Sequence, residues 1–277
     1  MKITKRYGFN DGRNVWRILI TDTDKIVLET RETESKEVFY NCLDFHTGEI
    51  IFKEMQLDEK YWIGIETIKN DVIFFHKFAS PDMPGHKQLI AYSINEQKTL
   101  WQSDEYVFLF YYKDKIYGYL DIFEGRKFYT VNPETGEFIE DLGTDAQSIN
   151  ALRELAREEE DYSDYRFTYK LYESEEAESI VGKRVPLSEI AGDAEFIDFH
   201  GHLFFNYHRK LSDGKKLRNE FTVVDKATGN TVFELTLNKE ANHYAPDSFF
   251  IYKNKLITVI EKNDFVVFDI SENESAV

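Results

Sequence analysis

Cysteine is nearly absent from this sequence, and no long apolar run occurs. The chain has 277 residues and one cysteine, Cys42, so it cannot form an internal disulfide. The apolar neighbours of Cys42 predict a buried, unreactive thiol. Because no run approaches 18 apolar residues, we predict no membrane-spanning helix. Residues Met1–Phe9 lack the apolar core of a secretory signal, so we expect a cytoplasmic protein.

Basic residues are scarce relative to acidic ones. The sequence has 34 Lys and Arg against 51 Asp and Glu, a formal net charge of −17. A surface that follows phosphates needs clustered Lys and Arg, so we expect neither nucleic acid nor an anionic membrane as a partner. The charge itself indicates a self-repelling, soluble surface. The G-x-S-x-G, H-E-x-x-H, P-loop and EF-hand patterns are all missing, and we expect no cofactor.

Aromatic residues, by contrast, are abundant. They make up 16% of the chain, with 23 Phe and 17 Tyr, which suits strands around a wide core. The length allows one large all-β domain or two ordinary ones.

A short pattern recurs along the chain: a small polar residue that ends a strand, a tight turn, and an apolar strand. Asp, Asn and Ser can bond their own downstream backbone in such turns, and Gly supplies the positive φ that closes them. Five copies at similar spacing indicate a structural repeat. The copies are Asp44–Phe52, Ser93–Trp101, Asn132–Phe138, Asp225–Phe233 and a truncated copy at 269–273.

A second pattern, a two- or three-residue polar turn before an apolar strand, runs in step with the first. Its apolar residues are spaced by 46, 44, 87 and 53 positions, and they are Ile26, Val72, Ile116, Leu203 and Leu256. Together the two patterns define five units of four strands, which predicts an all-β fold, a five-bladed β-propeller in a single domain over 1–277. The fifth unit has three strands, and we expect the N-terminal strand Lys2–Phe9 to complete it and close the ring. The alternative is a β-sandwich with irregular hairpins.

Residues 143–193 break the repeat between the third and fourth units. Residues 146–157 predict an amphipathic helix capped by Thr144 or Asp145, and its apolar face is expected to hold Ile149, Leu152, Leu155 and Ala156. A second acidic stretch, 173–178, is also predicted to be helical. The segment could instead hide a degenerate sixth blade with Tyr165–Tyr172 as its strand, but two helical stretches favour an insertion.

The pattern Asp44-x-x-Thr47-Gly48-Glu49-x-x-Phe52 resembles the blade signature of quinoprotein-type (pyrroloquinoline-quinone-like) propellers. In that family the turn and the aromatic residue lock neighbouring blades, so the resemblance implies a packing role and no catalytic residue. It also implies a vicinal cysteine pair and a calcium site for the dehydrogenase members, whereas this chain has a single cysteine. In size the chain resembles a small bacterial propeller family of uncharacterised role.

Alignment of the five second strands gives one set of candidate binding residues. The fifth position after each turn is polar or charged in every unit, and these residues are Arg31, Lys77, Asp121, His208 and Glu261. Ring symmetry would place them at equivalent heights on the face that carries the 143–193 insertion. They predict a ligand site at the propeller mouth, although strand ends are also polar simply because they meet water.

The histidines give a weaker signal. His200 and His202 flank a predicted hairpin turn, and two imidazoles without a third ligand predict no metal site. The interpretation we favour is a non-enzymatic module that binds an unidentified protein or small molecule at the face under the insertion. The alternative is a small-molecule enzyme of the metal-dependent hydrolase or lactonase type. That alternative requires Asp121, His208 and Glu261 to converge.

Overall fold

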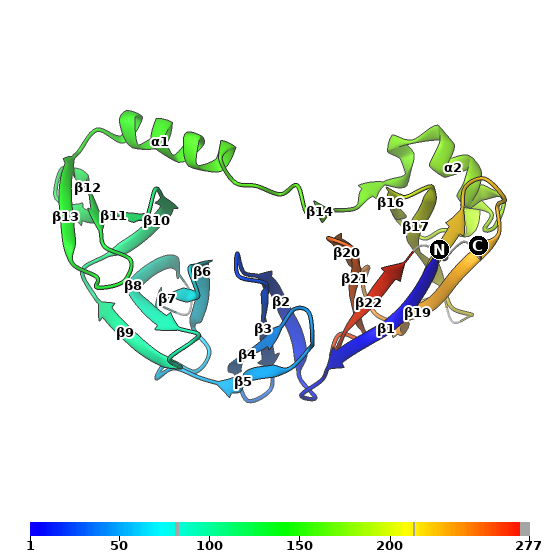
Figure 1. Ribbon diagram of the computed structural model, residues 1–277, viewed down its shortest axis with the longest axis horizontal. Helices are drawn as coiled ribbons and strands as arrows, with labels where there is room; N and C mark the ends of the chain where they lie inside the picture. The colour runs from blue at the N-terminus through cyan, green and yellow to red at the C-terminus, as the bar shows by residue number, and fades with distance from the viewer. Residues whose placement is uncertain (81–82, 213, 272–277) are drawn as a thin grey trace, which may run out of the picture. The chain divides into compact units, whose positions relative to one another are not determined.

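The computed structural model describes residues 1–80, 83–212 and 214–271, and it consists of five antiparallel sheets with two helices (Figure 1). Each sheet contains four strands that follow one another in the chain, except that the fifth sheet takes its outer strand from the N-terminus. This is the predicted all-β propeller organisation of five blades. Among the described residues, no helix is long and apolar enough to cross a membrane.

Three sheets precede the insertion. Their strands are β2 (Asn14–Ile20), β3 (Lys25–Glu32), β4 (Glu37–Asp44) and β5 (Ile50–Met55) in the first sheet; β6 (Ile63–Lys69), β7 (Val72–Ser80), β8 (Met83–Ser93) and β9 (Lys98–Ser103) in the second; and β10 (Val107–Tyr112), β11 (Lys115–Ile122), β12 (Gly125–Val131) and β13 (Phe138–Gly143) in the third.

The other two sheets each gain a short fifth strand from the insertion. The fourth sheet contains β15 (Tyr169–Lys170), β16 (Glu195–Phe199), β17 (His202–Lys210), β18 (Leu217–Asp225) and β19 (Thr231–Ala241). The fifth contains β1 (Lys2–Phe9), β22 (Asp264–Ser271), β21 (Lys255–Ile260), β20 (Phe249–Tyr252) and β14 (Tyr165–Arg166). Tyr165–Tyr172 is therefore not one strand of a sixth blade, because its two extended pieces pair with different sheets.

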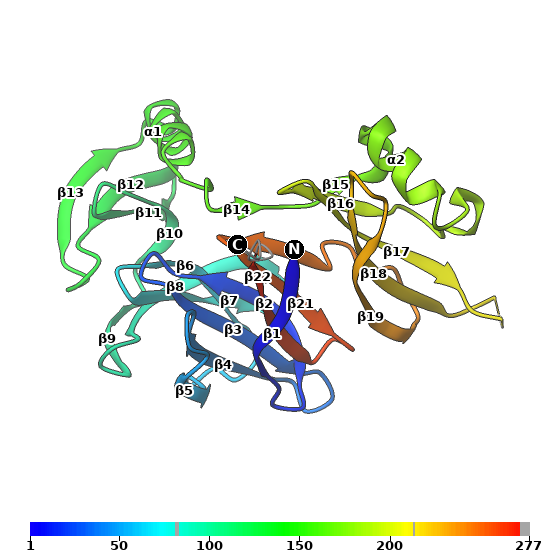
Figure 2. The same cartoon turned by 45° about the vertical axis from the view of Figure 1, so that its right-hand side comes forward.

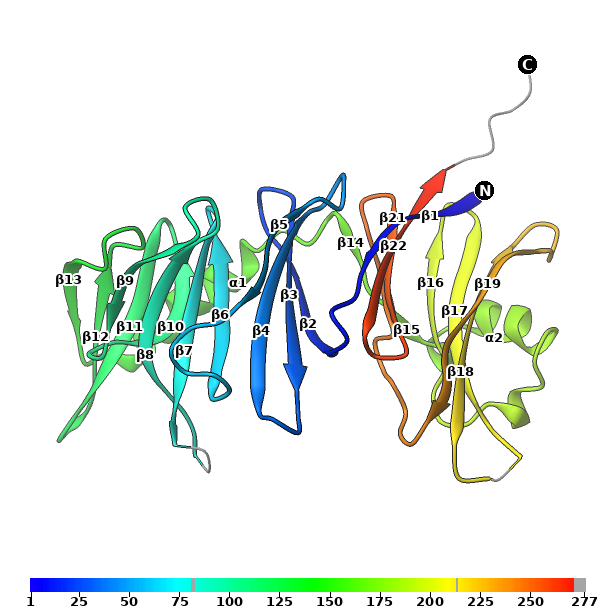
Figure 3. The ribbon, with the colours of Figure 1, turned by 90° about the horizontal axis from the view of Figure 1, so that it is seen from below.

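The N-terminal strand lies where the repeat predicts it. β1 lies beside β22 (Figure 3) and pairs with it antiparallel, from Lys2 opposite Ser271 to Phe9 opposite Phe265. The outer edge of β22 is thereby paired, which satisfies backbone groups that would otherwise form an open sheet edge.

The two repeated turns have the expected geometry. Asn70 and Asp71 join β6 to β7 with φ of 49° and 60°, the positive values that a two-residue hairpin requires. In the other turn, the Asp44 carboxylate accepts hydrogen bonds from the backbone of His46 and Thr47, and Gly48 has a φ of 76°. The last two residues of the truncated copy at 269–273 lie outside the described residues.

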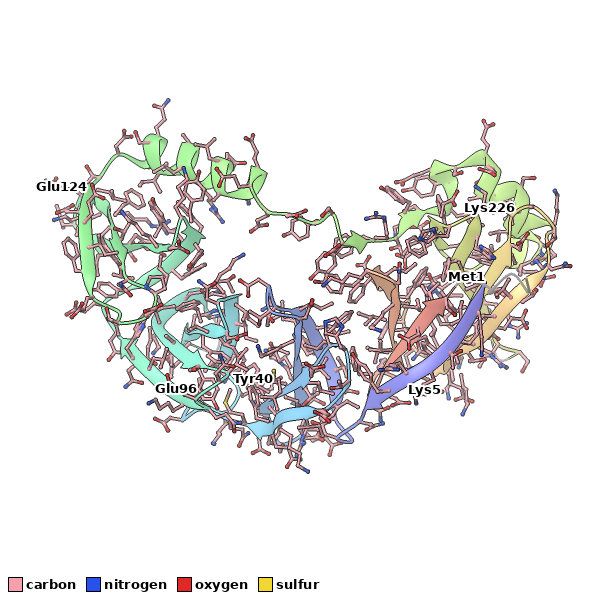
Figure 4. The ribbon with its side chains drawn as sticks, in the orientation of Figure 1. Met1, Lys5, Tyr40, Glu96, Glu124 and Lys226 are labelled. Carbon is pink, nitrogen blue, oxygen red and sulfur yellow. The ribbon has the colours of Figure 1, made fainter. Side chains whose placement is uncertain are left out.

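The chain divides into two compact units, one of residues 1–15 with 162–277 and one of residues 16–161. Within the second of these, the first and second sheets share a core of side chains that includes Tyr40, Cys42 and Phe75 (Figure 4 labels Tyr40). The second and third sheets share another, with Phe74 and Tyr129. Burial raises the pKa of the Cys42 thiol to about 12, as expected of an unreactive cysteine.

Aromatic residues at the turn pattern connect neighbouring sheets. The Phe52 ring meets Tyr92 of the second sheet edge-on at 5.9 Å, and Phe233 meets Phe268 of the fifth sheet at 5.3 Å. The Trp101 indole donates a hydrogen bond to the Pro133 carbonyl at 2.8 Å in the turn of the third sheet. These contacts match the packing role that the turn pattern implies.

The insertion supplies a helix to each unit. Helix α1 (Ala146–Glu158) packs on the third sheet beside β10 (Figure 2), and Asp145 is its N-cap. Helix α2 (Glu175–Gly182) packs on the fourth sheet, where Ala177 and Val181 join its apolar cluster. Two short 3-10 helices, η1 (Leu171–Glu173) and η2 (Leu187–Glu189), flank α2. Lys226 pairs with Glu176 of α2 at 3.0 Å (Figure 4).

The prediction of the apolar face of α1 is wrong at one residue, Leu155. Ile149 and Ala156 are buried and Leu152 packs beside them, but Leu155 is 47% exposed. At 3.6 residues per turn, Leu155 lies about 120° around the helix from Ile149, beyond the edge of the packed stripe.

Candidate functional site

A cleft of about 630 Å³ lies between α1 and the strands β6 and β10. Its floor is the strand β10, whose Phe110 and Tyr112 share the face that packs against α1, and the last turns of α1 form one wall. The pairing of β10 with β11 shifts between Phe108 and Phe110, so Phe108 packs with the core on the other face of the strand. This volume falls within the range of small-molecule sites, roughly 300–1,000 Å³. The cleft lies beside the α1 part of the insertion, but none of the five candidate residues from the sequence lines it.

Charged groups of both signs line the cleft. Lys69 and Lys113 come from the sheets, and Arg153 and Arg157 lie one turn apart on α1. Carboxylates face them from the same walls, and these are Asp22, Glu66, Asp114, Glu159, Glu160 and Asp161. A ligand in this space would meet both cationic and anionic groups beside an apolar floor.

Hydrogen bonds fix the helical wall to the floor. The Tyr112 hydroxyl donates to Glu159 at 2.7 Å, which holds the end of α1 against β10. At the other end of the cleft, the Tyr111 hydroxyl donates to Asp114 at 3.1 Å. Burial raises the pKa of Tyr111 to about 12, and the Asp114 carboxylate adds to that shift, so this hydroxyl remains a donor at neutral pH.

Beside the cleft, three titratable side chains meet on the second sheet. The Glu66 carboxylate lies 3.0 Å from Nδ1 of His76 and 2.7 Å from Nδ1 of His86. The two imidazole rings stack with centroids 3.5 Å apart and planes 7° from parallel. We call Glu66, His76 and His86 the His–Glu cluster; Glu66 also lines the cleft, so the cluster and the cleft share a wall.

Two β-bulges on either side of β7 create the His–Glu cluster. The pairing of β6 with β7 shifts between Ile65 and Thr67, so Glu66 is an extra residue in its strand. The pairing of β7 with β8 shifts after His76, where Gln88 is the extra residue with a φ of 56°. Bulges re-aim side chains locally, and here they bring the carboxylate and both imidazoles together, with their ligand atoms within 4.8 Å of one another.

The aromatic ring of Phe78 packs against the two imidazoles of the His–Glu cluster. His76 is 5% exposed, and the edge of Phe78 contacts both imidazoles at 4.9 and 5.5 Å. Burial alone would raise the pKa of Glu66, but the adjacent His76 and His86 outweigh it and hold that pKa below its usual range. The carboxylate is therefore ionised at neutral pH.

The five site residues predicted from the sequence lie on five different sheets. Among the residues that the structure describes, their hydrogen bonds and ion pairs go to other residues and not to one another. Arg31 pairs with Glu29 at 2.6 Å and lies over the ring of Trp16. Lys77 is half-buried beside Glu59, whose pKa it helps to lower. Asp121 points to solvent and pairs with Arg126 across its own hairpin. The Glu261 carboxylate accepts a hydrogen bond from the Lys239 backbone at 3.1 Å.

His208 is the predicted residue that does line a cavity. It borders a space of about 250 Å³ in the unit of residues 1–15 and 162–277, together with Lys170, Glu195 and Tyr244. The imidazole accepts a hydrogen bond from the Ala245 backbone at 3.1 Å, and burial lowers its pKa. Glu195, 2% exposed, pairs with Lys170 at 2.7 Å. Its neighbours hold His208 as a neutral, buried acceptor.

Sequence alignment of the repeats missed the His–Glu cluster by one position. It selected Lys77, whereas the neighbouring His76 carries the buried imidazole. Glu66 and His86 have no counterpart in the repeat, because each lies at or beyond a bulge that the turn spacing does not reveal. A prediction that β6, β7 and β8 form two consecutive β-hairpins would have placed the three residues at one end of one sheet. The turn Asn70–Asp71 already indicates that folding.

Residues 20–101 match a family model described as a domain of unknown function (DUF4905). No curated protein matches the sequence. Among solved structures, similarity is found to an uncharacterized protein from Listeria monocytogenes EGD-e, at 12% identity over 96% of this chain and 97% of that one, with a TM-score of 0.35. The Dos1 propeller is similar at 8% identity over 94% and 68% of the two chains, with a TM-score of 0.32. KlHsv2 with a Gly-Ser linker in place of loop 6CD matches at 10% identity over 96% and 84%, with a TM-score of 0.29.

Proposed function

We propose that the protein is a non-enzymatic binding module and that its ligand occupies the cleft between α1 and β10. The observation that carries the proposal is an open cleft of about 630 Å³ with charged groups of both signs over an aromatic floor. Small-molecule sites are concave and orient their ligands through converging polar groups, and here charged side chains of both signs form much of the lining.

The charge pattern suggests the class of ligand. Arg153 of α1 can bind a carboxylate, since its guanidinium fork matches that geometry. The carboxylates of Asp22 and Asp114, on the sheet side of the cleft, can bind an ammonium group, and Phe110 can contact an apolar part. A small zwitterion, such as an amino acid or a dipeptide, satisfies all three requirements.

The turn pattern supports a second, structural part of the proposal. We infer that these sheets are built like those of quinoprotein-type propellers at the level of turn and aromatic packing. The carboxylate of Asp225 bonds to the backbone and hydroxyl of Thr228 just as Asp44 bonds to Thr47. The likeness concerns packing alone, and no quinone chemistry is proposed.

Thermal unfolding with a panel of free amino acids and dipeptides tests the binding proposal. We expect at least one compound to raise the unfolding temperature of the intact protein, and Arg153→Ala to remove most of that increase. Leu155→Ala is the matched control, because Leu155 lies on the same helix but faces solvent. If no compound stabilises the protein, or if Arg153→Ala and Leu155→Ala respond alike, the cleft does not bind this class of ligand.

A further inference from the structure

The His–Glu cluster has the donor set of a transition-metal site. Glu66 offers a carboxylate oxygen, and His76 and His86 each offer a ring nitrogen, all within 4.8 Å of one another. For zinc, metal–nitrogen and metal–oxygen distances of about 2.0–2.2 Å place tetrahedral ligands roughly 3.3 Å apart. The separations of Glu66 from the two imidazoles, 3.0 and 2.7 Å, are close to that spacing.

His76 gives an independent reason to expect a ligand. Its ring is 5% exposed, and neither nitrogen has a hydrogen-bond partner among the described residues. The contact with Glu66 is short enough for a hydrogen bond but does not have the direction of one. A buried polar group without a partner costs free energy, so this imidazole would gain by coordinating an ion.

The backbone leaves room for the His76 ring. A Cβ atom at Gly64, directly across the strand pair from His76, would lie 2.9 Å from Cε1 of the imidazole. A side chain larger than hydrogen would therefore displace the ring from this position. The glycine therefore keeps the imidazole in its position beside the carboxylate.

We propose that Glu66, His76 and His86 bind a first-row divalent transition-metal ion, for which zinc is the representative probe. Two imidazoles with one carboxylate suit zinc or a similar borderline ion, while calcium and magnesium prefer oxygen ligands. The side chain of His86 is 36% exposed, which provides an entry path for the ion. Because Glu66 also lines the cleft, the ion would lie at the cleft wall, a feature beyond the binding function proposed above.

Coordination requires one adjustment of the described side chains. In parallel stacked rings the nitrogen lone pairs lie in two separate, parallel planes, so they cannot both aim at one ion until one ring tilts. His86 is the ring with freedom to tilt, because it is the more exposed of the two. Without metal, the same three groups form a carboxylate flanked by two imidazoles. The experiment must distinguish this metal-free cluster from a metal site.

Calorimetric titration of zinc into the chelator-treated, full-length protein tests the proposal. We expect a site of one zinc per chain in the wild type and a loss of affinity of at least about 100-fold in His86→Gln, since removing a ligand exceeds the usual 10–100-fold cost of losing a supporting group. The matched control is His46→Gln. His46 pairs with Asp24 at 3.0 Å but has no third ligand in the described residues, so this variant should bind zinc like the wild type.

A second variant keeps the test decisive if His86→Gln alters folding. Glu66→Gln retains the shape of the side chain and removes its charge, and we expect it to weaken zinc binding as well. Substituting cobalt for zinc gives a separate readout, a visible absorption band that depends on the geometry of the whole ligand set and should be weaker or altered in either variant. Absence of stoichiometric zinc binding in the wild type would overturn the proposal. So would wild-type affinity in both cluster variants, or equal loss in His46→Gln.

Discussion

At the scale of single residues, buried polar groups in turns tie one sheet to the next. Asp71 lies in the β6–β7 turn, is 8% exposed, and accepts from Lys25 of the first sheet at 2.8 Å and from Asn95 at 3.0 Å. The Thr23 hydroxyl also donates to it. Burial alone would raise the pKa of Asp71, but these hydrogen bonds outweigh it and hold the pKa below its usual range.

Asp71→Asn should therefore reduce the free energy of unfolding by about 1.5–3 kcal/mol, the usual contribution of hydrogen bonds to a charged group. Asparagine tolerates the positive φ of this position, so the turn itself should persist. Urea unfolding at neutral pH measures the loss. The control is Glu96→Gln in the exposed Glu96–Lys98 pair, which should change little.

The same pair of proteins gives a pH prediction. Since the folded pKa of Asp71 is depressed, its stabilisation is complete above its unfolded pKa of about 3.9 and is lost as the pH falls through the folded pKa. The stability difference between wild type and Asp71→Asn should be constant near neutrality and shrink in acid. A difference that is independent of pH down to the acid transition would contradict this role.

At the scale of elements, the helices of the insertion are parts of the packed core. Helix α1 buries Ile149 and Ala156 against Phe110 and Phe128, while α2 covers the fourth sheet. Removing the insertion would therefore expose apolar surface on both sheets, so point substitutions give cleaner tests of the cleft than deletion.

Tyr112→Phe should loosen the end of α1. It removes the hydrogen bond to Glu159, which we expect to cost about 1–2 kcal/mol and to speed amide exchange in the last turn of the helix. Hydrogen-exchange mass spectrometry of residues 150–160 measures the change. Tyr169→Phe, at an exposed ring, is the control; equal exchange in both variants would show that the hydroxyl does not hold the helix.

Periodicity and turn chemistry predict the strands well because both depend on local sequence. The turns at Asn70, Lys113 and Lys253 fall where polar pairs precede apolar strands, and the five sheets follow from their spacing. The candidate site is harder to predict. Glu66 and His86 reach His76 through bulges. A one-residue bulge shifts the alternation of side chains, so a strict period-2 pattern assigns the residues beyond it to the wrong face.

At the scale of the whole chain, neighbouring sheets within each compact unit share apolar cores, and the N-terminal strand completes the fifth sheet. The fourth and fifth sheets share a core with Phe221 and Phe249 in edge contact at 4.7 Å, and Ile3 of β1 packs against that core. A strand from the start of the chain thus stabilises the sheet made by its end.

Removal of residues 1–9 should therefore expose the edge of β22 and lower the unfolding temperature of the truncated protein. A peptide of residues 1–10 should restore stability by adding a strand to that edge, and a scrambled peptide of the same composition should not. Thermal unfolding followed by circular dichroism measures both effects. Unchanged stability after truncation would show that β1 contributes little.

The central claim about function is that the second sheet holds a metal ion at the wall of the cleft. Diffraction from crystals grown with zinc, recorded at the zinc absorption edge, tests it most directly. We predict one strong anomalous peak about 2.0–2.2 Å from a Glu66 carboxylate oxygen and from ring nitrogens of His76 and His86. Crystals of zinc-saturated protein with no anomalous peak at these three residues would contradict the claim.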